Sequence, residues 1–253
     1  MNINNLFILI FIALAGAGLL VLTQRVKKGS KVGLRPHSGF MALKKQVGYA
    51  IESGQRMHIS LGRGNLAGSS NPSSVAALTI LDHLAESSCA SGMPPVVTTG
   101  DGTLLVAGQD NLRQVYIKAH RASEFKPGMV EFQAGDTFPL AYAAGVTHIL
   151  NREGVGSNIL AGRFGSEIAL ITEAAERTQA EQLISSDDPI ALALAYPLAE
   201  ALIMGEEHLA AGAYLQGKPA QLASLQLQDI LRLLAAIAII VATLLALITG
   251  MAS

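Results

Sequence analysis

Two long stretches of the chain, one near each end, contain only uncharged and mostly apolar residues. They cover residues 6–22 and 233–248. Each approaches the roughly 20 apolar residues that cross a bilayer as an α-helix. We therefore predict an N-terminal transmembrane anchor over residues 1–24 and a C-terminal transmembrane anchor over residues 231–250.

Between the two anchors, short β-prone runs alternate with longer segments of helical periodicity. The predicted strands lie near residues 56–61, 95–99, 129–133, 157–161, 181–185 and 200–204. The predicted helices lie near residues 72–91, 103–122, 137–152, 166–178, 189–197 and 206–215. Such repetition is typical of parallel strands with helices on both faces. The fold class predicted for residues 50–216 is therefore α/β, a Rossmann-like, three-layer, mostly parallel sheet of five to six strands.

The sequence also indicates where helices begin and where the domain ends. Asn71 and Asp188 each precede a proline, so each is predicted to cap a helix with its side chain. Residues 25–49 are predicted to form a basic juxtamembrane linker. Residues 217–230 are predicted to form an amphipathic linker to the second anchor.

Basic residues gather in the predicted N-terminal linker, and no acidic residue precedes Glu52. They are Arg25, Lys27, Lys28, Lys31, Arg35, Lys44 and Lys45. Since these are seven of the 18 Lys and Arg residues, 11 remain against 19 Asp and Glu, a formal charge of −8. A nucleic-acid-binding surface must be basic, so nucleic acid is not an expected partner. The lipid bilayer is the expected partner of the basic residues.

The same basic residues predict the orientation of the chain in a bacterial inner or plasma membrane. By the positive-inside rule they keep the domain in the cytoplasm, with both termini extracytoplasmic. Alternatively, the first apolar stretch is a cleaved signal peptide, because small residues at 13–18 could form a cleavage site. A signal peptide normally has positive charge before a shorter apolar core, so a retained anchor is favoured.

Polar residues, mixed in charge and rich in glycine, follow the predicted strands. In an open parallel sheet, ligands bind beyond the carboxyl ends of the strands, where the strand order reverses. The candidate ligand-binding residues are Ser60, Gly62, Arg63, Gly64, Thr99, Asp101, Arg163, Gly165, Ser166 and Asp187. A small anionic or nucleotide-like ligand is therefore a candidate partner, while the sequence identifies no cofactor.

The glycine-rich stretch Gly62-x-Gly64-x-x-x-Gly68 lies between a predicted strand and a predicted helix. Backbone N–H groups and the helix dipole can meet an anion at such a place. The spacing is one residue longer than a dinucleotide fingerprint, and the stretch lacks the Lys-Ser or Lys-Thr of a P-loop. A flexible connector is the favoured interpretation, and an anion-binding loop is the alternative.

Two arginines of this rim, Arg63 and Arg163, could bind a phosphate or carboxylate with their paired N–H donors. Equally, each could form an ion pair with Asp101, Glu167 or Asp187 across the rim. The sequence favours the ion pairs slightly.

No set of residues forms a recognisable catalytic or metal site. His58 lies in an apolar strand and is predicted to be a hydrogen-bonded core histidine, and the other histidines lack ligand spacing. No Ser/His/Asp arrangement or nucleophile elbow can be assigned. The single cysteine, Cys89, excludes an internal disulfide and a cysteine-built zinc site. No catalytic residue and no metal site are therefore predicted, and enzymatic activity is not favoured.

Several stretches of the chain carry a family resemblance. They include ESGQRMHISLGRG at 52–64, FGSE at 164–167 and GEEHLAAGAYL at 205–215. These stretches resemble an uncharacterised family of prokaryotic membrane-tethered domains of unknown function. The resemblance extends from about residue 40 to the final helix, and it supports the domain boundaries without implying an activity.

Small residues recur at every fourth position of the second predicted anchor. Ala238, Ala242, Ala246 and Gly250 fall on one helix face. Small side chains let helix backbones approach closely in lipid, so we expect this face to pack against the first anchor or a neighbouring subunit. Alternatively, the pattern only reflects the abundance of alanine in this chain.

Three functions are compatible with these features. The favoured one is a non-enzymatic, membrane-anchored assembly or scaffold component that forms a homo-oligomer or binds other membrane proteins. The alternative is a membrane-tethered sensor that binds a small anionic or nucleotide-like ligand at the glycine-rich rim. The third is a hydrolase or transferase that uses rim carboxylates. The two anchors, the small-residue face and the lack of a catalytic set favour the first.

Overall fold

A computed structural model describes residues 3–30 and 32–251 of the chain. These residues form two compact units. The domain unit is Arg35–Gln216, and the helical unit combines the described residues of Met1–Leu34 with those of Gly217–Ser253. Lys31, one of the basic residues noted above, lies outside the described residues.

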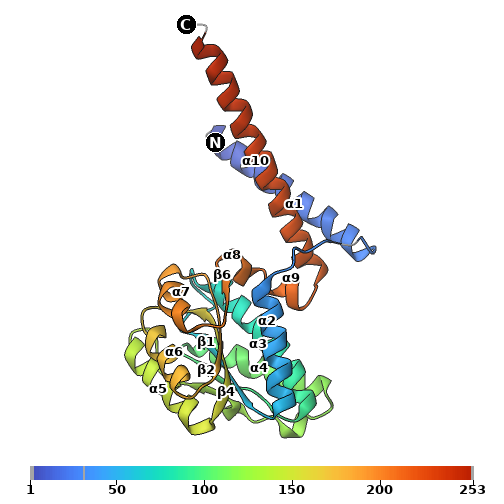
Figure 1. The fold of residues 1–253 in the computed structure, drawn as a ribbon. Helices are drawn as coiled ribbons and strands as arrows, with labels where there is room; N and C mark the ends of the chain where they lie inside the picture. The colour runs from blue at the N-terminus through green and yellow to red at the C-terminus, as the bar shows by residue number, and fades with distance from the viewer. Residues whose placement is uncertain (1–2, 31, 252–253) are drawn as a thin grey trace. The chain divides into compact units, whose positions relative to one another are not determined.

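A six-stranded sheet forms the centre of the domain unit (Figure 1). Its strands are β1 Arg56–Gly62, β2 Val96–Thr99, β3 Val130–Phe132, β4 Val155–Arg163, β5 Glu181–Ser186 and β6 Ala201–Met204. The order is β3-β2-β1-β4-β5-β6, and every neighbouring pair is parallel. The predicted parallel α/β sheet is confirmed. Its strand order reverses between β1 and β4, the two central strands.

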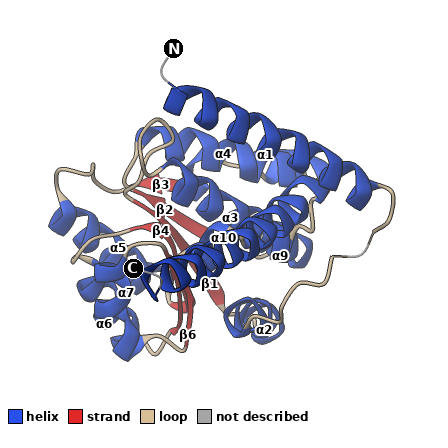
Figure 2. Ribbon diagram, turned by 90° about the horizontal axis from the view of Figure 1, so that it is seen from above, coloured by secondary structure: helices blue, strands red, loops and turns tan. Residues whose placement is uncertain are grey.

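Helices cover both faces of this sheet, as Figure 2 shows. One face is covered by α2 Ser38–Ser53, α3 Asn71–Ser91 and α4 Gly102–Lys118. The other is covered by α5 Pro139–Glu153, α6 Ile168–Arg177 and α7 Pro189–Ala195. Two short helices, α8 Glu206–Leu209 and α9 Ala211–Leu215, follow β6, and three single 3₁₀ turns cover Ala122–Glu124, Pro127–Met129 and Tyr196–Leu198. The three-layer arrangement is therefore as predicted.

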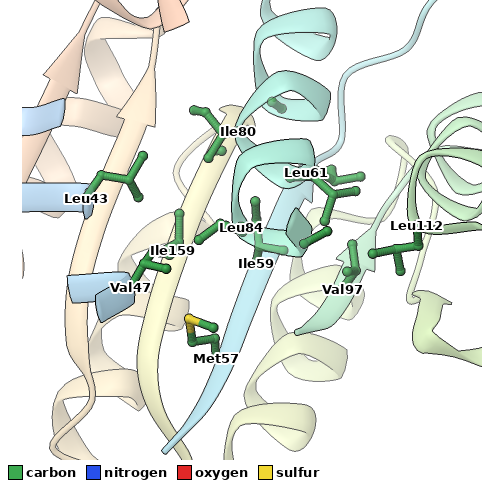
Figure 3. Packing of buried hydrophobic residues seen from close by; sticks show 14 of the residues in the cluster. Leu43, Val47, Met57, Ile59, Leu61, Ile80, Leu84, Val97, Leu112 and Ile159 are labelled. Carbon is green, nitrogen blue, oxygen red and sulfur yellow. The ribbon is translucent and has the colours of Figure 1, made fainter. Parts of the chain in front are cut away.

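The larger of the two hydrophobic clusters lies between the sheet and the helices α2, α3 and α4. Figure 3 shows Ile80 and Leu84 of α3 gathered with Ile59 of β1 and Ile159 of β4. All four side chains are fully buried. Burying a side chain of this size contributes about 1.5–3 kcal/mol, so the two central strands carry much of the hydrophobic stabilisation.

Helix α2 lies within residues 25–49, for which the sequence predicts a linker. Its apolar residues Phe40, Leu43 and Val47 are buried against the sheet, while Lys44 and Lys45 between them are exposed. The spacing of the three apolar residues is that of one helix face. The charged residues conceal this amphipathic pattern, and the domain unit begins at Arg35 rather than at residue 50.

The two predicted side-chain caps differ in outcome. Asp188 caps α7, because its Oδ1 accepts hydrogen bonds from the N–H groups of Ile190 at 2.8 Å and Ala191 at 3.1 Å. The prediction for Asn71 is wrong, since α3 begins at Asn71 and its Nδ2 donates to the carbonyl of Leu66 at 2.5 Å. No side-chain hydrogen bond caps this helix at Ser70. The start of α3 therefore lacks the cap that the sequence suggests.

The helical unit contains two helices that are long and apolar enough to cross a membrane, α1 Ile3–Lys27 and α10 Pro219–Met251. The qualifying segments, Ile8–Lys27 and Pro219–Leu247, have mean hydropathies of 2.0 and 2.7 and are not buried. At 1.5 Å per residue, α10 extends about 50 Å, which exceeds the roughly 30 Å of a hydrocarbon core. The predicted linker 217–230 is therefore mostly the first part of a longer helix.

Within the helical unit, α1 contacts the first half of α10. A Cβ placed on Gly18 would lie 3.3 Å from a methyl carbon of Leu227. By contrast, Ala238 and Ala242 of the small-residue face are exposed, and Gly250 lies in the same helix. The α1 contact thus lies on α10 before the small-residue face begins.

Candidate functional site

The carboxyl ends of β1 and β4 approach each other so closely that only glycine fits. Gly62 and Gly162 have φ angles of +73° and +123°, in the region that favours glycine. A Cβ on Gly62 would lie 2.3 Å from the carbonyl oxygen of Arg163, and one on Gly162 would lie 2.5 Å from that of Leu61. The backbone N–H of Arg63 also donates to the Arg163 carbonyl at 2.9 Å. Gly62, a candidate ligand residue, thus permits this close approach of the two strands. We call the place where they meet, around Gly62 and Arg163, the β1–β4 crossing.

The loop between β1 and α3 is held by its own hydrogen bonds. The N–H of Asn65 donates to Ser70 Oγ at 2.9 Å, and the N–H of Gly68 donates to Asn65 Oδ1 at 2.6 Å. The N–H of Leu66 donates to Thr103 Oγ1 at 3.1 Å, which joins this loop to the start of α4. The glycine-rich stretch is therefore a hydrogen-bonded loop at the reversal of the strand order.

Arg63 is engaged by two carboxylates. Its Nε donates to Oε1 of the buried Glu167 at 2.8 Å, and one of its terminal nitrogens donates to the carboxylate of the exposed Asp136. The N–H of Gly165 donates to the same Glu167 oxygen at 2.8 Å. Although burial opposes ionisation of Glu167, the hydrogen bonds from Arg63 and Gly165 hold its pKa below the ordinary value. Of the alternatives for Arg63, the ion pair with Glu167 is present.

Arg163 differs from Arg63 in having no such partner. It ends β4 and is exposed, and its side chain makes no hydrogen bond or ion pair within the described part of the chain. Its Cβ would lie 3.3 Å from a Cβ built on Gly64, so the side chain leaves the backbone beside the glycine-rich loop. This guanidinium is available to an anion.

The start of α3 contains a buried hydroxyl without a hydrogen bond. Ser74 is fully buried, and its Oγ has no partner among the described residues. A Cβ placed on Gly64 would lie 2.8 Å from this oxygen, so the hydroxyl faces the glycine-rich loop. Sequence reasoning did not select Ser74, although the run Asn71–Ser74 at the helix start could have indicated it.

Two candidate residues, Thr99 at the end of β2 and Asp101 just after it, stabilise the start of α4. Asp101 Oδ1 accepts hydrogen bonds from the N–H groups of Thr103 at 2.8 Å and Leu104 at 3.1 Å, and from the Thr103 hydroxyl. The N–H of Asp101 donates to Thr99 Oγ1 at 3.3 Å. Because every one of the carboxylate bonds falls on Oδ1, the Oδ2 atom stays available to another donor.

Ser60, another candidate, belongs to a buried polar network beneath the rim. Its hydroxyl lies 2.5 Å from the hydroxyl of Tyr142. In the same network, His58 shares hydrogen bonds with Asn158 Oδ1 at 2.7 Å and Thr98 Oγ1 at 2.9 Å. Burial lowers the pKa of His58 to about 4, so the ring is neutral at pH 7. The expectation of a hydrogen-bonded core histidine is confirmed, and Ser60 is engaged below the surface.

A second buried histidine, His208, connects three segments that are distant in sequence. Its Nδ1 lies 2.7 Å from Ser185 Oγ at the end of β5, and its Nε2 lies 3.0 Å from Ser73 Oγ in the first turn of α3. Burial lowers the pKa of His208 to about 4. This contact joins α3 to α8, and no local sequence pattern predicts it.

The remaining candidates are spread along the rim. Ser166 is exposed after β4, and Asp187 is exposed after β5, one strand further from the β1–β4 crossing. The described residues contain no group of three or more His, Cys, Asp or Glu side chains that could hold a metal ion. The structure therefore brings Gly62, Gly64 and Arg163 together at the crossing but leaves Ser166 and Asp187 at its border.

A separate cavity lies at the opposite end of the sheet, where β1, β2 and β3 begin. Its volume is about 500 Å³, and its lining includes Arg56, Pro94, Met129, Glu131 and Glu153. Its charged residues are paired, Arg56 with Glu153 and Glu131 with Arg152. None of the candidate ligand residues lines this cavity.

The comparisons with known proteins identify a family and no characterised relative. A family model described as "Domain of unknown function (DUF6754)" matches residues 1–253. Neither the curated proteins nor the solved structures compared with the chain gave a match.

The two ion pairs of Arg63 should differ in their contribution to stability. We predict that Glu167→Ala lowers the free energy of unfolding by about 1.5–3 kcal/mol, because it removes the charged acceptor of Arg63 Nε and Gly165 N–H while Asp136 still compensates the charge of Arg63. Asp136→Ala, at an exposed partner, should cost less than about 1 kcal/mol. Thermal unfolding of the detergent-solubilised full chain, followed by circular dichroism, measures both. Equal losses in the two variants would contradict the assignment of Glu167 as the structural partner.

Proposed function

We propose that this chain, which belongs to the DUF6754 family, is a membrane-anchored domain that binds a small anionic ligand at the β1–β4 crossing. The observation that carries the proposal is the position of Arg163 at the reversal of the strand order, where it is exposed and has no partner within the described part of the chain. Open parallel sheets bind ligands at this reversal, because the loops there diverge and leave a crevice.

The charges at the crossing support an anion rather than a cation. Arg63 is paired with two carboxylates, those of Glu167 and Asp136, whereas Arg163 has no ion pair among the described residues. The N-terminal end of α3 lies on the same rim and carries the positive end of the helix dipole. An anion gains from both, while a cation would meet only repulsion from them.

The structure gives binding more support than catalysis at this rim. The carboxylates that could serve as acid or base have structural roles: Asp101 and Asp188 cap helices, and Glu167 holds Arg63. We therefore place ligand binding before a hydrolase or transferase activity.

Arg163 provides the direct test of this function. We expect at least one small anion from a panel of phosphates and carboxylates to raise the melting temperature of the full chain in detergent. A ligand at 100 times its dissociation constant adds about 2.7 kcal/mol, or several degrees. Arg163→Ala should weaken that ligand about tenfold or more, because a charge-assisted hydrogen bond is lost.

The matched control is Arg113→Ala, an exposed arginine on α4 that lies within the helix rather than at the rim. It should leave the ligand-induced shift unchanged. The proposal fails if no anion of the panel shifts the melting temperature of the unaltered chain, or if both variants lose the shift equally.

We further propose that the two apolar helices hold the domain at the cytoplasmic face of a bacterial plasma membrane. The basic residues Arg25, Lys27 and Lys28 at the end of α1 support this orientation by the positive-inside rule. Ser69→Cys places a thiol on an exposed loop, and the native Cys89 is buried. A membrane-impermeant maleimide should label this variant only in permeabilised cells. Labelling in intact cells would contradict the proposed orientation and indicate the opposite one.

Self-assembly through α10 is a second candidate function. It is favoured by the exposure of Ala238 and Ala242 on one helix face, since small residues allow close helix approach in lipid. In native membranes, Ala242→Cys should therefore form disulfide-linked dimers on mild oxidation. Ile240→Cys, about 200° around the helix, should form far fewer. Equal cross-linking of both, or none, argues against this assembly.

A further inference from the structure

We infer that the ligand of the β1–β4 crossing carries both a phosphoryl group and a neighbouring pair of hydroxyls, as sugar phosphates and nucleotides do. This inference rests on the proposed function and adds the chemical class of the ligand. The phosphoryl group is assigned to the start of α3, and the hydroxyls are assigned to Asp101.

The start of α3 offers unusual conditions for a phosphoryl group. The helix is 21 residues long, and no side-chain hydrogen bond caps it at Ser70. The first N–H groups of a helix have no partners within the helix and favour an anion. The N–H groups of Asn71 and Ser74 donate to the carbonyls of Gly68 and Ser70, and Pro72 has no N–H, so among the described residues of this first turn the N–H of Ser73 is the donor that remains for a ligand.

Ser74 supplies an independent indication of a missing acceptor. Its hydroxyl is fully buried and has no hydrogen-bond partner among the residues that the structure describes. A buried hydroxyl without a partner is unfavourable, and a ligand that accepts its hydrogen bond would remove this cost. The hydroxyl faces Gly64, where a side chain would approach it to 2.8 Å. The backbone of Gly64 therefore lies next to this donor.

Arg163 completes the phosphoryl site with a charge. It leaves the backbone beside Gly64 and has no ion pair in the described structure. The planar guanidinium matches two oxygens of a phosphoryl group, which makes arginine suited to this ligand. Arg63 is not assigned to this site, because its Nε is paired with Glu167 and its Nη1 with Asp136.

Asp101 distinguishes a sugar phosphate from a simple anion. It follows β2, the neighbour of β1, and the bond from Leu66 N–H to Thr103 Oγ1 holds the glycine-rich loop against the helix that Asp101 caps. Oδ1 is occupied by the cap, whereas Oδ2 is available to accept from a hydroxyl. A carboxylate repels a bare phosphate or a dicarboxylate but accepts hydrogen bonds from hydroxyls. A ligand that satisfies both ends must therefore carry both groups.

The test measures binding of three probes to the full chain in detergent by isothermal titration calorimetry. Ribose 5-phosphate and adenosine 5′-monophosphate carry both groups, and inorganic phosphate carries only one. Ser74→Ala should lower the affinity for all three probes about fivefold or more, because each probe uses the phosphoryl site. The control Ser88→Ala removes a buried hydroxyl further along the same helix and should change none.

Asp101→Asn separates the hydroxyl site from the phosphoryl site. Asparagine still caps a helix, so the fold is retained, but the acceptor charge is lost. The affinity for the two ribose probes should fall about fivefold or more, while inorganic phosphate should bind equally well or better. The control is Asp188→Asn, which changes the equivalent cap of α7 at a position beyond the crossing and should leave all probes unchanged.

A phospholipid headgroup with a diol has the same chemistry as a free sugar phosphate. The titrations are therefore repeated in nanodiscs of phosphatidylcholine and of phosphatidylglycerol, whose headgroup carries a diol. If ribose 5-phosphate binds in phosphatidylcholine nanodiscs but not in phosphatidylglycerol nanodiscs, the lipid headgroup occupies the site and is its ligand. If ribose 5-phosphate binds equally in both, the ligand is a soluble molecule.

The outcomes separate this inference from the proposed function. If citrate binds in an Arg163-dependent manner while none of the three phosphate probes binds, the phosphoryl assignment is overturned and anion binding stands. If the phosphate probes bind but Asp101→Asn affects them no more than Asp188→Asn does, the hydroxyl assignment is overturned. If no anion binds at all, both the inference and the proposed function fail.

Discussion

The structure of the domain depends on the close parallel pairing of β1 with β4 at the centre of the sheet. Gly62 and Gly162 make this pairing feasible at its carboxyl end, because any side chain there would collide with a backbone carbonyl. The chain builds outward from this pair in both directions, through β2 and β3 on one side and β5 and β6 on the other. The same pairing brings the segments after β1 and β4 together at the reversal of the strand order, the place where open parallel sheets bind ligands. Fold and candidate site thus share one physical cause.

The electrostatics of the candidate site depend on a difference between its two arginines in their ion-pair partners. Arg63 is anchored by the buried Glu167, an arrangement that stabilises the loop connections and leaves little charge for a ligand. Arg163 lies beside Gly64, and its side chain has no ion pair with any residue that the structure describes. Also beside Gly64, Ser74 has a buried hydroxyl without a partner among the described residues, and Asp101, which follows the neighbouring strand β2, keeps one carboxylate oxygen available. Donors for an anion and an acceptor for hydroxyls therefore lie on adjacent loops of one rim.

Most of the fold could be predicted from the sequence, because alternating strand and helix patterns are local signals. All six strands lie where periodicity placed them, and Asp188 caps its helix as its position before a proline suggested. Helix α2 was not recognised, since Lys44 and Lys45 interrupt the apolar face formed by Phe40, Leu43 and Val47. The domain boundary was placed too late for the same reason.

The site was less predictable than the fold, because its decisive features are contacts between distant segments. The sequence offered Glu167, Asp101 and Asp187 as equal partners for the arginines, and only the fold selects Glu167 for Arg63. The unsatisfied Ser74 and the bridge from His208 to Ser73 depend on which side chains meet in space. Hydrogen exchange of the full chain, with and without saturating inorganic pyrophosphate, tests the central claim most directly. The account predicts slower exchange confined to residues 62–74 and 163–167. Protection at the opposite end of the sheet, around residues 92–96 and 128–131, or no protection anywhere, would contradict it.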